Sequence, residues 1–313
     1  MNDKTTIMAL GLNPAWQKTL FFSELRRGNV NRAGRMTLMA SGKGINFCRA
    51  AAAWQQSSLL LHFLGGRNGA DIAAELRREN ITAINIDTAA ETRMCTTCLC
   101  AASGEMTELI EPSGMISEHE LRQLQAAIAD HLPACGGLAL CGTYPPGIDA
   151  TLYRDAAVAA GKLGIPVMLD SWKEVVPTLE AGVSWLKINR EELLAMTGSG
   201  TLEYGLRWCF ERYRIGFAAI TDGPGTACLS DGKSLWRYEL PYLPRVGNPI
   251  GAGDTCTAVT FTEFLRGTAP SEAFALGLAA ASASCLTEAA AVFSVAEALA
   301  LRQGIKIAID SLK

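Results

Sequence analysis

The sequence lacks the motifs that identify several common enzyme classes. It contains no GxGxxG, GxSxG or HExxH pattern. The usual signals of nicotinamide enzymes, serine hydrolases and zinc proteases are therefore missing. The three histidines, His62, His119 and His131, have no spacing typical of metal ligands. No second CxxC accompanies the one in the stretch 94–100 (MCTTCLC), although the chain has 10 cysteines. We therefore expect buried, reduced cysteines rather than a zinc site.

Charged residues and long apolar segments are also limited. Only 19% of the residues are charged and the net charge is −3, so nothing favours attraction to nucleic acid or to an anionic membrane. The N-terminus shows no basic region followed by a long apolar stretch, and the Ala-rich run 273–287 is too short to span a bilayer. We expect a cytoplasmic protein that binds neither nucleic acid nor membranes.

Short apolar segments alternate with helical patterns over most of the 313 residues. This alternation predicts an α/β fold with a mostly parallel sheet that helices cover on both faces. The expected strands are 7–12, 59–63, 138–141, 167–170, 185–188 and 217–221, and the expected helices are 45–55, 70–78, 118–129, 153–160 and 191–196.

The stretch 92–110 departs from this alternation. Two β-prone segments flank Ser103–Gly104 and indicate a hairpin. Together with the segment near 30–39, this hairpin can form a small sheet that projects from the body. A second hairpin is expected at Asp231–Gly232. Because no low-complexity linker interrupts the chain, we expect one domain, 1–313, with lid segments at about 13–40 and 91–111.

The most informative stretch is NPIGAGDTCTAVTF, residues 248–261. Gly251 and Gly253 allow a tight turn, and the helix that follows presents free N–H groups to an anion. Asp254 suits a phosphoryl-transfer site, where a carboxylate accepts the proton of the attacking hydroxyl. The alternative is that Asp254 only caps the helix.

Three further segments carry candidate ligands. SGKGIN (41–46) offers Lys43 to an anion and Asn46 to hydroxyls. WLKINREEL (185–193) ends a strand and offers phosphate-binding groups and a carboxylate for Mg²⁺. ITDGPGTA (220–227) follows a strand as a glycine-rich turn. Taken singly, each segment is also compatible with an ordinary turn or a solvated helix start.

Taken together and in this order, these segments resemble the ribokinase-like (PfkB-type) sugar kinase family. SGKGIN is similar to its Gly-Gly-Lys-Gly-x-Asn motif, LKINREEL to its Lys-Pro-Asn-x-x-Glu segment and NPIGAGDT to its Gly-Ala-Gly-Asp signature. The resemblance implies a three-layer fold with a small β-sheet lid, and an enzyme that uses ATP and Mg²⁺. The residues it implies are Asp254, Gly251, Ala252 and Gly253 for catalysis; Gln17, Gly42, Lys43, Asn46, Arg93 and Thr143 for the sugar; Lys187, Asn189, Thr221, Gly223 and Gly225 for ATP; and Glu192 for the metal.

Finer features resemble the branch of 1-phosphofructokinases and tagatose-6-phosphate kinases. They are LNPAWQKT, GNVNRA, the pair Thr92–Arg93, EPSG and GTYPPG. This branch implies a phosphorylated ketohexose as substrate, namely fructose 1-phosphate, fructose 6-phosphate or tagatose 6-phosphate, with Arg93 and Lys43 holding its phosphate. It also suggests a homodimer formed through the lid. A kinase of an unphosphorylated sugar or nucleoside, and a non-catalytic sugar-binding protein on the same fold, are the alternatives.

Four positions, which make up three departures, differ from the pattern of this branch. Trp16 and Gln17 stand where an aliphatic residue and an aspartate are usual, Ser41 replaces a glycine, and Lys173 replaces another. Because an amide can donate hydrogen bonds that an ionised carboxylate cannot, Gln17 predicts a changed hydroxyl preference. We expect Gln17 to face the sugar from the end of the first strand.

Overall fold

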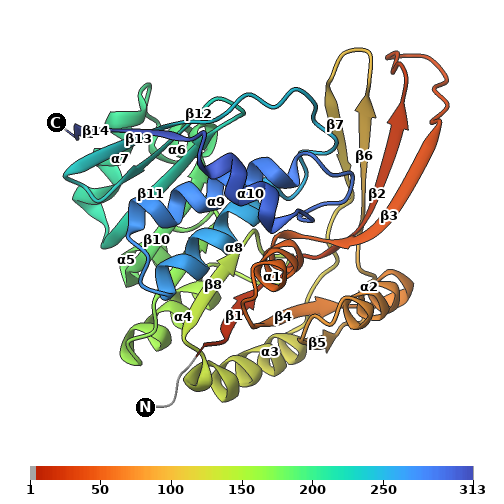
Figure 1. Cartoon of the computed structure of the whole chain (residues 1–313). Helices are drawn as coiled ribbons and strands as arrows, with labels where there is room; N and C mark the ends of the chain where they lie inside the picture. The colour runs from red at the N-terminus through yellow and green to blue at the C-terminus, as the bar shows by residue number, and fades with distance from the viewer. Residues whose placement is uncertain (1–4, 313) are drawn as a thin grey trace.

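The computed structural model describes residues 5–312, and its strands and helices alternate as the sequence predicts (Figure 1). The strands are β1 Ile7–Leu10, β2 Ala15–Phe22, β3 Arg35–Ser41, β4 Ser58–Leu64, β5 Ala83–Asp87, β6 Met94–Cys100, β7 Met106–Ile110, β8 Gly137–Cys141, β9 Val167–Asp170, β10 Val183–Asn189, β11 Ile215–Asp222, β12 Thr226–Ser230, β13 Ser234–Glu239 and β14 Lys306–Ser311. The helices are α1 Lys43–Ala53, α2 Gly66–Arg78, α3 Glu118–His131, α4 Thr151–Lys162, α5 Val176–Ala181, α6 Arg190–Thr197, α7 Leu202–Arg212, α8 Ala252–Leu265, α9 Pro270–Ser284 and α10 Val295–Arg302.

A ten-stranded sheet forms the body of the molecule, in the order β14-β13-β12-β11-β10-β9-β8-β1-β4-β5. Neighbouring strands from β11 to β5 are parallel, and those from β11 to β14 are antiparallel. The six strands expected from the sequence all belong to this sheet. Strands β1, β8 and β9 are buried along their whole length, because helices cover both faces of the sheet.

Two apolar cores lie on opposite faces of this sheet. One contains buried residues of α1, α8, α9 and α10, the helices that Figure 1 shows in front of the sheet. The other contains buried residues of α3, α4, α5, α6 and α7. The Ala-rich run 273–287 falls mostly in α9, whose small side chains pack closely against α8. The three-layer α/β prediction is therefore confirmed.

A separate four-stranded sheet, in the order β3-β2-β6-β7, projects from the body; we call it the lid. The predicted hairpin at Ser103–Gly104 joins β6 to β7, with Gly104 at a φ of +70°. Strand β3 runs directly into α1, and β2 follows β1 after a short loop. The predicted hairpin at Asp231–Gly232 is also present, between β12 and β13 of the main sheet.

The topology brings the candidate segments to one edge of the main sheet. The carboxyl ends of the parallel strands β1, β8, β9, β10 and β11 lie along that edge, where ligands of open α/β sheets bind. The N-termini of α1 and α8 reach the same place, because α1 packs against α8 and both contact this part of the sheet.

Candidate active site

The glycine-rich turn before α8 has the backbone geometry expected of it. Gly251 caps α8 with a φ of +79°, and a Cβ there would lie 2.9 Å from the backbone N of Ala291. A side chain is therefore excluded at Gly251 by both conformation and space. Of the three amides predicted to hold the transferred phosphoryl group, the Ala252 N–H already donates to the Pro249 carbonyl at 3.2 Å. The Gly251 and Gly253 amides carry no such bond within residues 5–312.

Asp254 lies in the first turn of α8 and is 8% exposed. The Asn46 side chain, from the first turn of α1, donates from Nδ2 to Asp254 Oδ2 at 2.8 Å. Burial raises the pKa of Asp254, while Lys43 opposes the rise and Asp170 adds to it. An aspartate with a raised pKa at a helix start, next to open backbone amides, has the properties of a general base.

Asp170 is a site residue that the sequence analysis missed. It ends β9, is 1% exposed, and accepts hydrogen bonds at 2.5 Å from Lys43 Nζ and at 2.5 Å from Thr257 Oγ1. Lys43 contacts Oδ1 and Thr257 contacts Oδ2, and Lys187 Nζ lies 3.8 Å from that same Oδ2. Burial disfavours the ionised form, but Lys187 and Lys43 outweigh this effect and hold the pKa of Asp170 below its ordinary value. The available signal was an acidic residue at the carboxyl end of a predicted parallel strand.

Lys43 occupies a different place from the one predicted. It was expected beside Arg93, but its ammonium group pairs with Asp170, and it is absent from the pocket that Arg93 lines. The charges of Asp170 and Asp254 raise the pKa of Lys43 despite its desolvation, so it stays protonated. The preceding residue, Gly42, has a φ of +118°, and a Cβ there would lie 2.9 Å from Pro14 Cα. The sharp turn at Gly42, where β3 passes into α1, therefore directs Lys43 toward Asp170.

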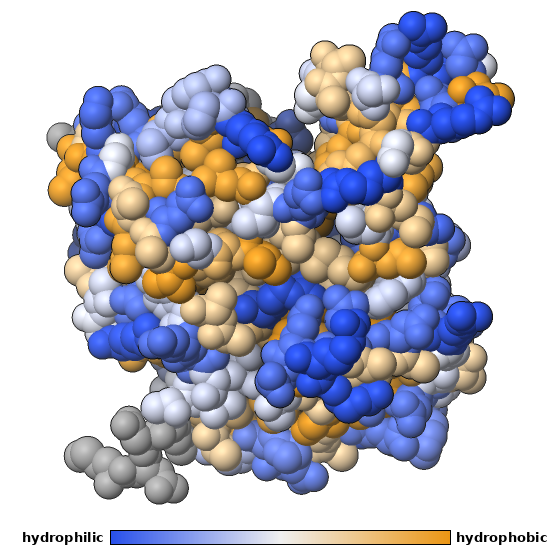
Figure 2. All heavy atoms as spheres, turned by 45° about the vertical axis from the view of Figure 1, so that its right-hand side comes forward, coloured by the Kyte–Doolittle hydropathy of each residue, from blue (hydrophilic) through white to orange (hydrophobic). Residues whose placement is uncertain are grey.

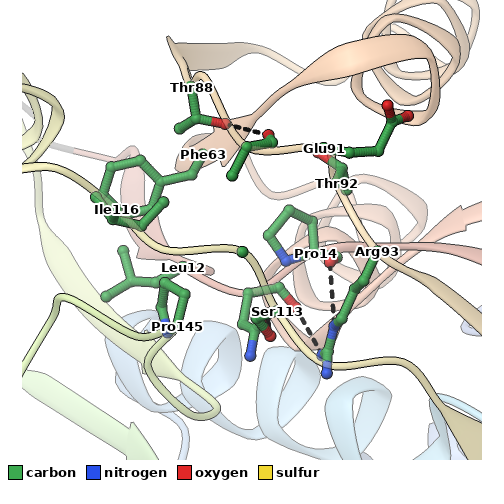
Figure 3. A pocket seen from close by; sticks show the side chains of 13 residues that line it. Leu12, Pro14, Phe63, Thr88, Glu91, Thr92, Arg93, Ser113, Ile116 and Pro145 are labelled. Atoms are coloured by element: carbon green, nitrogen blue, oxygen red, sulfur yellow. Dashed lines mark hydrogen bonds between the residues drawn. The ribbon is translucent and has the colours of Figure 1, made fainter.

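Arg93 lies at the base of the lid and lines a small pocket (Figure 3). Its Nη2 donates to the Asn13 carbonyl at 3.1 Å, and its Nε to the Pro14 carbonyl at 3.5 Å. The Asn13 side chain accepts from Ser113 Oγ at 2.7 Å and donates to Thr143 Oγ1 at 3.4 Å. Thr143 and Arg93 are thus linked through Asn13. The residues around the pocket are Leu12, Asn13, Pro14, Phe63, Thr88, Ala90, Glu91, Thr92, Arg93, Ser113, Gly114, Ile116 and Pro145.

Gln17 does not lie at the end of the first strand, so that prediction is wrong. It lies within lid strand β2 and is buried, and its Nε2 donates to Thr97 Oγ1 at 2.9 Å and to the Lys18 carbonyl at 3.1 Å. Gln17 pairs in register with Met39, whose Sδ accepts from the Ala290 amide of the main body. Gln17 therefore shares the lid face that is turned toward the body. Both of its amide hydrogens have protein partners, so its Oε1 is the atom left for a ligand.

The predicted nucleotide residues come together at the ends of β10 and β11. Asn189 and Thr221 are paired in register at these ends, and Gly223, with a φ of +64°, begins the turn to β12 that also contains Gly225. Asn189 and Glu192 cap α6 reciprocally: Asn189 Oδ1 accepts from the Glu192 amide, and Glu192 Oε2 accepts from the Asn189 amide, both at 2.8 Å. Asn189 Nδ2 and Glu192 Oε1 remain for a ligand.

Lys187 reaches the start of α8 from β10. A Cβ at Gly253 would lie 2.9 Å from Lys187 Nζ, so the ammonium group lies almost against the glycine-rich turn. Gly251 is thus required by its contact with backbone, whereas a Cβ at Gly253 would have to displace the Lys187 side chain. The site therefore concentrates two cations, Lys43 and Lys187, around the buried pair Asp170 and Asp254.

Within residues 5–312, no three His, Cys, Asp or Glu side chains form a group that could hold a metal ion. Glu192 Oε1 would supply one oxygen ligand, which would suit Mg²⁺ that arrives with nucleotide phosphates and keeps several waters. No helix in the same range is long and apolar enough to cross a membrane.

Several solved structures have the same fold as this chain. The structure is similar to phosphofructokinase-2 from Escherichia coli in complex with substrates and products, with a TM-score of 0.86 and 22% identity over 95% of this chain and 98% of that chain. It is also similar to a possible 1-phosphofructokinase of Thermotoga maritima, with a TM-score of 0.81 and 15% identity over 98% of this chain and 100% of that chain. Arabidopsis thaliana ribokinase complexed with ribose and ATP has a TM-score of 0.74 and 19% identity over 96% of this chain and 99% of that chain.

These structural likenesses show a ribokinase-like fold. The family model described as pfkB family carbohydrate kinase matches residues 5–296, which is nearly the whole chain. Enzymes of this family are ATP-dependent phosphotransferases that act with a divalent metal. The chain belongs to the pfkB family of carbohydrate kinases.

Proposed function

We propose that this kinase transfers the terminal phosphoryl group of Mg²⁺-bound ATP to a hydroxyl of a phosphorylated ketohexose. Fructose 1-phosphate, fructose 6-phosphate and tagatose 6-phosphate are the candidate acceptors, and the product is a bisphosphate. The observation that carries this proposal is the environment of Arg93. Within residues 5–312 its guanidinium contacts two backbone carbonyls and no carboxylate, so its charge is available to an anion in the adjoining pocket.

The transfer site is separate from this phosphate pocket. In the proposed reaction the acceptor hydroxyl lies against Asp254, which takes its proton as the oxygen attacks the terminal phosphorus. The Gly251 and Gly253 amides and the cations Lys43 and Lys187 stabilise the negative charge of the transferred group. A sugar phosphate that spans from Arg93 to Asp254 would present the hydroxyl at its unphosphorylated end.

The nucleotide would occupy the edge formed by β10 and β11. Lys187 and Asn189 would contact its phosphates, and Thr221, Gly223 and Gly225 would line its remaining part. Mg²⁺, held by Glu192 directly or through water, neutralises phosphate charge when it is bound. Closure of the lid would exclude water, which otherwise competes with the sugar for the phosphoryl group. A reaction that consumes ATP fits a cytoplasmic location.

The lid would also join two copies of the chain. Leu38 and Leu109 share the lid face opposite to Gln17, and they are 42% and 58% exposed. Figure 2 shows apolar residues along the projecting lid, with hydrophilic residues at its tip. An exposed apolar sheet face favours a partner. A homodimer should therefore be detected by sedimentation, and Leu38→Glu should shift it toward monomer.

Initial rates of ADP formation with a panel of acceptors test the proposed reaction. The panel pairs each candidate ketohexose phosphate with its unphosphorylated sugar and includes nucleosides. We expect at least one phosphorylated ketohexose to be preferred by kcat/KM. Preference for an unphosphorylated sugar or nucleoside would support the alternative kinase, and no turnover with any acceptor would support a non-catalytic sugar-binding protein.

A further inference from the structure

The amide of Asn46 is held in one orientation by its neighbours. Its oxygen, Oδ1, accepts from Ser41 Oγ at 3.3 Å and from Arg49 Nη1 at 3.2 Å, and its Nδ2 donates to Asp254 Oδ2 at 2.8 Å. The reversed amide would place its oxygen against a carboxylate and its NH₂ group against a guanidinium, which removes two hydrogen bonds. Since Ser41, Asn46, Arg49 and Asp254 are all buried, such a loss could not be compensated by water.

Arg49 is itself anchored on several sides. Its Nε and Nη2 form a bidentate pair with Glu79, which caps the C-terminus of α2, at 2.9 and 3.0 Å. The same guanidinium donates to the Ala40 carbonyl at the end of lid strand β3, and to the Ala290 carbonyl at 3.3 Å. Ala290 is adjacent to Ala291, the residue packed against Gly251. Arg49, a side chain of α1, therefore contacts both the base of the lid, at Ala40, and the segment that packs against the glycine-rich turn, at Ala290.

We propose that Ser41 and Arg49 are positioning residues for the base, which they orient by locking the Asn46 amide with its N–H toward Asp254. This inference rests on the proposed role of Asp254 in phosphoryl transfer. It gives a function to Ser41, one of the positions where this chain departs from its family pattern. The chain carries a hydroxyl there that glycine cannot supply.

The hydrogen bond from Asn46 stabilises the ionised form of Asp254 and lowers its pKa. Other charges also face Asp254: Lys43 from α1, Asp170 from β9 and Lys187 from β10. Around Arg49, Glu75 of α2 and Glu79 at the C-terminal cap of α2 both pair with its guanidinium. Loss of the lock would weaken the Asn46 bond while leaving the other charges in place. The pKa of Asp254 should then rise, and the base should lose its proton only at higher pH.

The test is the pH dependence of kcat at saturating substrates for the full-length enzyme. The variants are Ser41→Ala and Arg49→Lys, each made in the native chain and in an Asn46→Ala background. The acid limb is the low-pH side of the pH profile, where kcat falls as Asp254 becomes protonated. In the native chain we expect both variants to move this acid limb to higher pH. On that limb the loss should be about 2- to 10-fold, the range that one hydrogen bond supplies. Titration of the substrate phosphates affects every variant equally.

Glu79→Gln is the matched control, because it removes the ion pair on the far side of the same guanidinium and leaves the bond to Asn46. We expect it to lower the melting temperature without moving the limb. In the Asn46→Ala background, Ser41→Ala and Arg49→Lys should produce no further shift. A limb unchanged by both variants, or an equal shift in the Asn46→Ala background, would overturn the lock.

Ser41→Ala removes one hydroxyl and decides the question if Arg49→Lys fails to fold. The failure of the lock can be told from failure of the proposed function. If Asp254→Asn keeps normal turnover, the base itself is misassigned; if it is inactive while the limb of the lock variants stays fixed, only the lock is wrong.

Discussion

Gly253 and Lys187 approach each other so closely that a methyl group on Gly253 would lie 2.9 Å from the Lys187 ammonium nitrogen. This contact joins the predicted anion-binding turn to a predicted nucleotide ligand. The Gly253→Ala substitution should therefore displace Lys187 from the turn. Because Gly253 lies in the first turn of α8 without a positive φ, alanine fits the backbone there, and this variant should be about as stable as the native protein.

We expect Gly253→Ala to lower kcat by about 10- to 100-fold, the effect of misplacing a catalytic group by about 1 Å. Thermal unfolding and initial rates measured on the same sample separate the two effects. A loss of activity that parallels a loss of stability would show that Gly253 is needed for folding rather than for the position of Lys187.

Asp170→Asn tests the electrostatic coupling within the site. The Asp170 charge raises the pKa of Asp254, so its removal should lower that pKa and keep the base ionised at lower pH. The acid limb of kcat should thus move to lower pH, the opposite direction from the Ser41 and Arg49 variants. Maximal kcat should fall, because Lys43 loses its 2.5 Å partner. An acid limb that stays in place would argue against coupling between the two carboxylates.

The sequence predicted the fold well, because buried parallel strands have uninterrupted apolar segments, such as that of β9, in the sequence. It predicted less of the site, for reasons visible in particular residues. Lys43 was assigned to the sugar phosphate by its motif alone, whereas its partner Asp170 lies 127 positions away in the chain. Gln17 was placed at the end of the first strand by its motif alone, although Asn13–Pro14 marks a turn between β1 and the lid strand β2. Long-range pairing and strand boundaries depend on tertiary packing.

Arg93→Ala tests the phosphate pocket. We expect it to raise KM for the preferred sugar phosphate far more than KM for ATP, because a charge-assisted hydrogen bond contributes about 1.5–3 kcal/mol. The unphosphorylated sugar should be used equally poorly by both proteins. Steady-state kinetics with each substrate varied in turn provide the comparison, and equal changes in both KM values would assign Arg93 a structural role at the base of the lid.

Gln17→Asp tests whether the lid residue selects the sugar. The carboxylate cannot donate to Thr97 as the amide does, and it offers a charged acceptor to sugar hydroxyls. We expect the ranking of sugar phosphates by kcat/KM to change while KM for ATP stays constant. Thr97→Val is the control, because it removes the partner and keeps Gln17. If that control changes the ranking equally, or if Gln17→Asp leaves it unchanged, Gln17 does not select the sugar.

The most direct test of the central claim is the turnover of Asp254→Asn with saturating ATP and the preferred sugar phosphate, measured beside the binding of both ligands by calorimetry. Asparagine keeps the shape of the side chain but cannot accept the proton, so kcat should fall by about 10²- to 10⁴-fold, as for loss of a general base. Both dissociation constants should stay within a few-fold of the native values. Near-normal turnover of Asp254→Asn, with both substrates bound, would contradict the account.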